Sequence, residues 1–260
     1  MAGQNVVEAS GRVGDADAVR ELAELLDRLF IERRDVKAWQ TANGKYLPDR
    51  TQITMSDLCA HLSGERTLGH YLLSREDKCR LLAFDIDLAT TGVWDGRPID
   101  PRGEFGNAIG LIREGLTGQV LIVAERLARV VQRELGVPVA IAFSGSKGCH
   151  VFGFTGSEAA SLVRDAALDV IEACGCFRPL HGANFFAHEN DDMSCQVEVF
   201  PKQSSLKGKD LGNLLRLPLG RNLKSGNESF FVRTGGGRRS EFWRMDPLAA
   251  LGGQLPWRDR

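Results

Sequence analysis

The sequence has no apolar run that approaches the roughly 18 residues needed for a membrane-spanning helix. Its N-terminus, MAGQNVVEASGRVGD, lacks the apolar stretch typical of a secretory signal peptide. These absences predict a cytoplasmic protein. In that compartment we expect the six cysteines to be reduced, metal-bound or simply buried.

The sequence also lacks an internal repeat and a large excess of either charge, since its formal net charge is −1. That total hides a gradient. Residues 201–260 carry 12 Lys and Arg against 5 Asp and Glu, whereas the other 200 residues carry 21 against 29. A basic final quarter beside an acidic body fits a local surface that binds a polyanion. Solvated charge near a chain end explains the gradient about equally well.

What the sequence contains is ordinary for a soluble globular protein: 260 residues, 43% of them hydrophobic and 26% charged. We expect a disordered tail at 1–14, a single domain at 15–252 and a second tail at 253–260. The domain divides into a helical part, 15–66, and a core, 67–252.

Apolar spacing and turn residues predict the elements of that domain. Helices are expected near 15–30, 56–62, 118–135 and 157–174. Strands are expected at 67–73, 80–87, 139–143, 150–154, 197–200 and 213–219, with a loop at 91–106, an irregular stretch at 175–195 and a flexible loop at 234–240. This order predicts an α+β fold on mixed or antiparallel sheet, and not a doubly wound one.

Two carboxylates close the apolar run Leu81–Asp87. Asp85 and Asp87 are two residues apart, so a strand would present both on the same face. Aspartate is disfavoured in strands, and two on one face repel each other unless a cation lies between them. The pattern favours a metal site. Surface residues or caps of the next element are the plainer alternative.

A small cationic turn follows, Ser144-Gly145-Ser146-Lys147-Gly148-Cys149-His150. It does not meet the P-loop pattern, and a strand follows it instead of a helix. A glycine-rich hairpin turn still directs backbone N–H groups, the hydroxyls of Ser144 and Ser146 and the Lys147 ammonium toward one point, which suits phosphate. His150, taken alone, is more often a structural residue.

The third segment, Val197–Lys202, carries one more acid, Glu198, between apolar neighbours. By itself it is equally well a solvent-facing strand position. Downstream, Arg216 lies within the apolar run Leu214–Leu219, where an arginine generally pairs with an anion. Three acids on neighbouring strands, facing hydroxyls, Lys and His, are the equipment for nucleotidyl transfer by two metal ions.

These segments resemble the archaeo-eukaryotic primase superfamily, whose three motifs are an hhhDhD strand, an SGxxGxH turn and a later acidic strand. Here they read LLAFDID (81–87), SGSKGCH (144–150) and VEVF (197–200). The match is closest to the primase-polymerases of CRISPR-associated and TOTE-type conflict systems. It rests on the segments at 30–48 and 61–72, FPKQ (200–203) and GNLLRLPLG (212–220), and covers roughly 19–252.

The resemblance implies an RRM-like catalytic sheet packed against an α/β module, with the active site in the cleft between them. Asp85, Asp87 and Glu198 would hold two Mg²⁺ or Mn²⁺ ions; Glu198 stands where the superfamily often has Asp. The nucleotide would be bound by Ser144, Ser146, Lys147, His150, Lys202 and Arg216.

The implied activity is synthesis and extension of primers on a single-stranded DNA template from dNTPs or NTPs. We expect the basic segment 201–244 and the stretch Arg33–Tyr46 to form the template face, and CRISPR adaptation or conflict-system proteins to be partners. A catalytically silent single-strand binder and a metal-dependent nuclease are the alternatives. Three intact acids count against the first, and the phosphate-binding turn counts against the second.

A structural zinc site is a separate hypothesis. Two histidines and three cysteines lie within 22 residues, in a stretch short of core residues: Cys174, Cys176, His181, His188 and Cys195. Their spacings fit no standard zinc finger. Cys174 also continues the apolar face of the preceding helix, so burial in the core is the alternative.

Overall fold

The computed structural model describes residues 16–88, 93–94, 97–98, 116–188, 195–234 and 242–253. These form an α+β fold in which every strand pairing is antiparallel. The predicted fold class is therefore confirmed. Among the described helices, none is long and apolar enough to cross a membrane.

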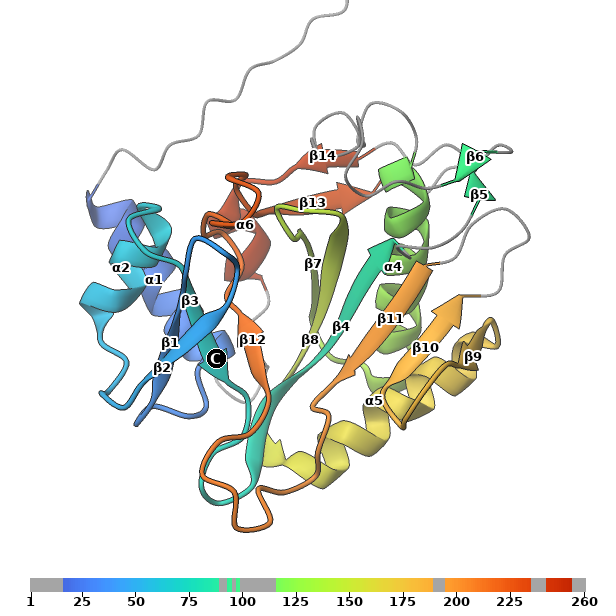
Figure 1. Ribbon diagram of the computed structural model, residues 1–260, viewed down its shortest axis with the longest axis horizontal. Helices are drawn as coiled ribbons and strands as arrows, with labels where there is room; N and C mark the ends of the chain where they lie inside the picture. The colour runs from blue at the N-terminus through green and yellow to red at the C-terminus, as the bar shows by residue number, and fades with distance from the viewer. Residues whose placement is uncertain are drawn as a thin grey trace, which may run out of the picture.

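The larger sheet has eight strands in the order β14-β13-β7-β8-β4-β11-β10-β9 (Figure 1). In chain order they are β4 (Lys78–Leu88), β7 (Val139–Phe143), β8 (Gly148–Ala159), β9 (Phe177–Pro179), β10 (Phe185–His188), β11 (Cys195–Phe200), β13 (Phe230–Thr234) and β14 (Phe242–Arg244). The apolar run predicted to be a strand thus becomes a central one, flanked by β8 and β11.

The smaller sheet has the order β12-β3-β1-β2. Its strands are β1 (Lys37–Gln40), β2 (Tyr46–Asp49), β3 (Leu68–Tyr71) and β12 (Leu214–Arg216), and a separate pair is formed by β5 (Val93–Trp94) and β6 (Arg97–Pro98). Although β3 and β4 follow each other in the chain, they lie in different sheets. The chain also returns after β11 to place β12 beside β3.

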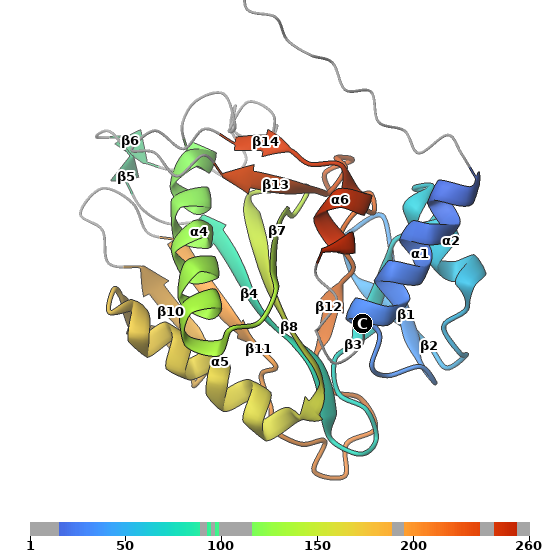
Figure 2. The ribbon, with the colours of Figure 1, turned by 180° about the vertical axis from the view of Figure 1, so that it is seen from behind.

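The helices are α1 (Ala16–Phe30), α2 (Met55–Leu62), α4 (Leu116–Leu135), α5 (Ala160–Cys174) and α6 (Pro247–Gly252). Figure 2 shows α4 and α5 across one face of the large sheet. Gly153 packs so closely against Val131 of α4 that an added Cβ would lie 3.0 Å from it. Residues on β8 and β4 that share the side of Gly153 therefore face the helices, and the alternate residues face the opposite way.

Several boundaries differ from prediction. Residues 37–40 and 46–49 are strands, so the part before residue 66 is not purely helical. Ser157 does not begin a helix, because β8 continues to Ala159 and α5 starts at Ala160 without a side-chain cap. The stretch 175–195 contains β9 and β10. Helix α2 begins at Met55, and Thr54 caps it through a capping box with Asp57. The predicted tails, most of the loop at 91–106 and the loop at 234–240 lie outside the described residues.

Candidate active site

Strand register brings the three predicted acids onto one face of the large sheet. Asp85 lies directly opposite Glu198 of β11 on one side and His150 of β8 on the other. Asp87, two residues further along β4, lies opposite Gly148. Directly opposite residues point to the same side of a sheet. Since Leu82 packs at Gly153 on the helix side, the three acids lie on the face that α4 and α5 leave open (Figure 1).

Each carboxylate lies beside a Lys or His side chain. His150 Nε2 lies 3.3 Å from Asp85 Oδ1, Lys147 Nζ lies 3.0 Å from Asp87 Oδ2, and Lys202 forms an ion pair with Glu198. Within the described ranges, no group of three or more His, Cys, Asp or Glu side chains is arranged as a metal site. Strand pairing brings the three acids together, and their carboxylates contact Lys and His side chains.

The pKa values of the three acids reflect burial first and neighbouring charges second. Burial raises the pKa of Asp87, and the nearby charge of Asp85 raises it further, against the opposing effect of Lys147. Burial likewise raises the pKa of Glu198, while Lys202 and His181 oppose it. For Asp85, burial acts upward, but His150, Arg216 and Lys147 outweigh it and hold the pKa below its ordinary value. A cation placed among these groups would relieve the repulsion.

The donor set therefore fits the divalent metals that the family resemblance implies. Mg²⁺ and Mn²⁺ prefer carboxylate oxygens, and three carboxylates share one face at adjacent register positions. Lys147, His150 and Lys202 contact these carboxylates here.

The turn between β7 and β8 is built to approach the acids closely. Ser144 N–H donates to the Gly148 carbonyl over 2.9 Å, which closes the turn. A Cβ at Gly148 would overlap the Ile86 carbonyl and Asp87 Oδ1. Gly145 has φ of +74°, the left-handed region that glycine adopts without strain. Both glycines are thus required by geometry, and Lys147 is delivered beside Asp87.

A loop at 222–229, buried at Asn222 and Ser229, supports this turn. Ser225 Oγ donates to the Gly145 carbonyl, and Ser229 Oγ donates to the Phe143 carbonyl over 2.7 Å. Asn222 is buried against Gly145, 3.2 Å from the position of an added Cβ. The sequence did not predict this contact. The Asn, Ser and Gly residues of 222–229 indicate a turn, but they do not show what the turn packs against.

Arg216 connects the two sheets. It lies on β12 of the small sheet, and its guanidinium donates to the Ser144 carbonyl in the turn. Opposite Arg216 on β3 is Gly69, where the ring of Tyr46 packs 2.9 Å from the position of an added Cβ. Burial raises the pKa of Tyr46 to about 12, while Arg216 lowers it and Asp85 raises it. The Tyr46 ring therefore packs at the position of β3 that lies opposite Arg216, which the sequence did not predict.

Two cations of the predicted template face, Arg33 and Lys37, are buried, so the prediction is wrong for them. Arg33 is 2% exposed and its Nε donates to Asp35 over 2.9 Å. Lys37 is also buried, and its ammonium lies 2.6 Å from Asp57 Oδ2. Both charges are neutralised in the interior. Other cations of the two predicted template segments are exposed, among them Lys45 and Lys224, and the stem of Lys224 packs at Gly44 beside Lys45.

The predicted zinc site is wrong. Cys174 and Cys195 are buried in the core. His181 stacks on Phe185, whereas His188 packs edge-on against Phe177. Because Phe185 and His188 are three residues apart on β10, they point to opposite faces. In the part of the chain that the structure describes, the five residues form no metal-binding group.

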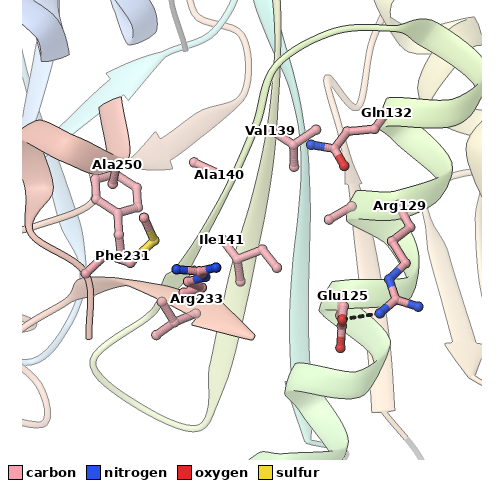
Figure 3. Close-up of a pocket in the computed structure, with 12 residues that line it drawn as sticks. Glu125, Arg129, Gln132, Val139, Ala140, Ile141, Phe231, Arg233 and Ala250 are labelled. Carbon is pink, nitrogen blue, oxygen red and sulfur yellow. Dashed lines mark hydrogen bonds and ion pairs between the residues drawn. The ribbon is translucent and has the colours of Figure 1, made fainter. Parts of the chain in front are cut away.

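A separate pocket of about 320 Å³ lies between α4, β7 and β13 (Figure 3). Its lining includes Arg129 and Gln132 of α4, Ile141 of β7, and Phe231 and Arg233 of β13. The predicted site residues do not line it. The pocket is therefore distinct from the carboxylate cluster.

Comparison with known proteins gives two findings. A sequence model of the family described as "TOTE conflict system, Archaeo-Eukaryotic Primase domain" matches residues 22–245. A solved structure, the polymerase domain from Mycobacterium tuberculosis Ligase D in complex with DNA, is similar at 12% identity and a TM-score of 0.35, over 83% of this chain and 72% of that one. No curated protein matches the chain.

Proposed function

The chain belongs to the archaeo-eukaryotic primase domain family of TOTE conflict systems, and we propose that it synthesises and extends primers on single-stranded DNA. Membership of a primase family points to a nucleotidyltransferase-type enzyme. The observation that carries the finer proposal is the register of β8, β4 and β11. Glu198, Asp85 and His150 form a row across one face of the sheet, and Asp87 lies opposite Gly148 of the turn that carries Lys147.

In this proposal the incoming triphosphate binds on the β8 side of this row, at the turn between β7 and β8. Lys147, Ser144 and Ser146 belong to one turn, His150 follows it, and Arg216 reaches that turn from β12. Charge-assisted hydrogen bonds from such groups orient the phosphates. Asp85, Asp87 and Glu198 would hold two Mg²⁺ or Mn²⁺ ions. When bound, these ions supply Lewis acidity that lowers the pKa of the primer 3′-hydroxyl and stabilises charge on pyrophosphate.

Incorporation of labelled dNTP or NTP on a single-stranded template tests the proposal. The wild-type protein is expected to form product with Mg²⁺ or Mn²⁺, and Asp87→Asn is expected to form none. A matched control is Glu76→Gln, an exposed acid in the turn before β4. A silent binder would bind the template without product, and a nuclease would shorten it.

A further inference from the structure

An aromatic stack lies beside the carboxylate cluster and has no part in the function proposed above. The rings of His181 and Phe185 are 4.6 Å apart between centroids, with planes only 19° apart. His181 is exposed and Phe185 is half-buried. Phe185 covers one face of the imidazole, so His181 presents its other face outward on a supported ring.

Strand register fixes where this stack lies. Phe185 of β10 is directly opposite Glu198 of β11, and Glu198 is directly opposite Asp85 of β4. The stack therefore shares the face of the acids. It lies on the side of the cluster away from β8, whose turn carries Lys147 beside Asp87.

Lys202 adds a cation to the same side. It pairs with Glu198, and its ammonium lies 5.5 Å from the centroid of the Phe185 ring and 4.7 Å from that of Phe200. A ring platform with an adjoining ammonium is the combination that binds single-stranded nucleic acid, because bases stack and the backbone is anionic. This position separates Lys202, which the sequence predicts to bind the nucleotide, from the turn at 144–150.

In phosphoryl transfer, the attacking and leaving oxygens lie on opposite sides of the transferred phosphorus. If pyrophosphate leaves on the β8 side, the attacking 3′-hydroxyl must approach from the β11 and β10 side. We propose that the exposed face of His181, supported by Phe185, stacks the terminal base of the strand whose 3′ end is extended, and that Lys202 binds the phosphate of that terminal nucleotide. This inference rests on the proposed function.

The test is a binding measurement that needs no catalysis. A primer carrying 2-aminopurine at its 3′ end, annealed to a template with a single-stranded overhang, is titrated with the full chain. Stacking of that base on His181 is expected to quench its fluorescence. His181→Ala is expected to remove the quenching and weaken binding about 5- to 20-fold, whereas His181→Tyr restores both because it returns a ring.

A matched control exists on the other face of the same hairpin. His188 packs edge-on against Phe177, 5.4 Å between centroids, away from the acids. His188→Ala is expected to leave quenching and affinity unchanged. The inference is overturned if His181→Ala quenches like the wild-type protein, if His188→Ala loses as much, or if the wild-type protein gives no quenching. Quenching that depends on His181 in a protein that incorporates no nucleotide would support the platform and reject the polymerase function.

Discussion

We expect acid to lower the stability of the folded protein through one buried histidine, His61. The ring is fully buried, its Nδ1 accepts from Leu68 N–H over 3.1 Å, and its Nε2 lies 2.9 Å from the Pro218 carbonyl. Those contacts require a neutral ring with the proton on Nε2. If Nδ1 were protonated, its N–H would face the Leu68 N–H, and two donors would lie against each other. Burial accordingly lowers the pKa of His61 to about 4.

The sign and size of the effect follow from linkage. Above pH 6.5, His61 is neutral in both the folded and unfolded states. As the pH falls, the unfolded chain takes up the proton first, so stability is lost between pH 6.5 and about 4. At about 1.36 kcal/mol per pKa unit, the whole shift corresponds to roughly 3 kcal/mol, of which about 2 kcal/mol is lost by pH 5. The contact with Pro218 lies two residues beyond Arg216, so we expect acid also to loosen the segment that carries this arginine.

Urea unfolding at pH 8 and at pH 5 measures this loss. His61→Gln, which is neutral at every pH, is expected to be less stable at pH 8, because a buried hydrogen bond is lost. It should lose about 2 kcal/mol less than the wild-type protein between the two pH values. Equal losses in both proteins would refute the reasoning. His70 is a second buried ring, whose pKa burial lowers to about 3, so the His61→Gln variant should retain some acid sensitivity.

Three further predictions concern the active site. Asp85→Ala or Asp87→Ala is expected to abolish primer synthesis and extension while binding of single-stranded DNA survives; extension at the wild-type rate by either variant would reject the metal assignment. His150→Ala and Arg216→Ala are expected to weaken nucleotide binding roughly 10- to 150-fold, the loss of about 1.5–3 kcal/mol for one charge-assisted hydrogen bond; an unchanged dissociation constant in both would make these residues structural. Gly148→Ala is expected to displace the turn from Asp87 and reduce nucleotide affinity with a smaller loss of thermal stability, since its Cβ would overlap Asp87 Oδ1; calorimetric titration and thermal unfolding of the same sample check both.

Local chemistry was readable from the sequence because it depends on neighbours in the chain. The alternation around Asp85 and the turn at 144–150 both depend on a few adjacent residues. Long-range pairing was not readable. The sequence suggested consecutive strands at 67–73 and 80–87, but β3 pairs with β1 and β12 while β4 pairs with β8 and β11. Short strands such as β2, YLPD, contain a proline that masks strand character.

Side-chain partners were similarly beyond the sequence. Arg33 appeared to be a surface cation, yet Asp35 and Asp210 neutralise it in the interior. The five Cys and His residues near 174–195 looked like one cluster, but strand alternation separates His181 from His188. Composition counts residues, whereas the pleat of β10 decides which face each one occupies.

The pairing of β12 with β3 in the small sheet constrains the order in which the chain can fold during synthesis. Leu214 pairs with Tyr71, 143 residues earlier. The small sheet therefore cannot be completed until Leu214–Arg216 has left the ribosome, and β3 has an unpaired edge until then. Cutting the chain between its N-terminal part and its core would leave both pieces with open strand edges. The two sheets are thus inseparable as expression units, even though they contribute different sides of the candidate site.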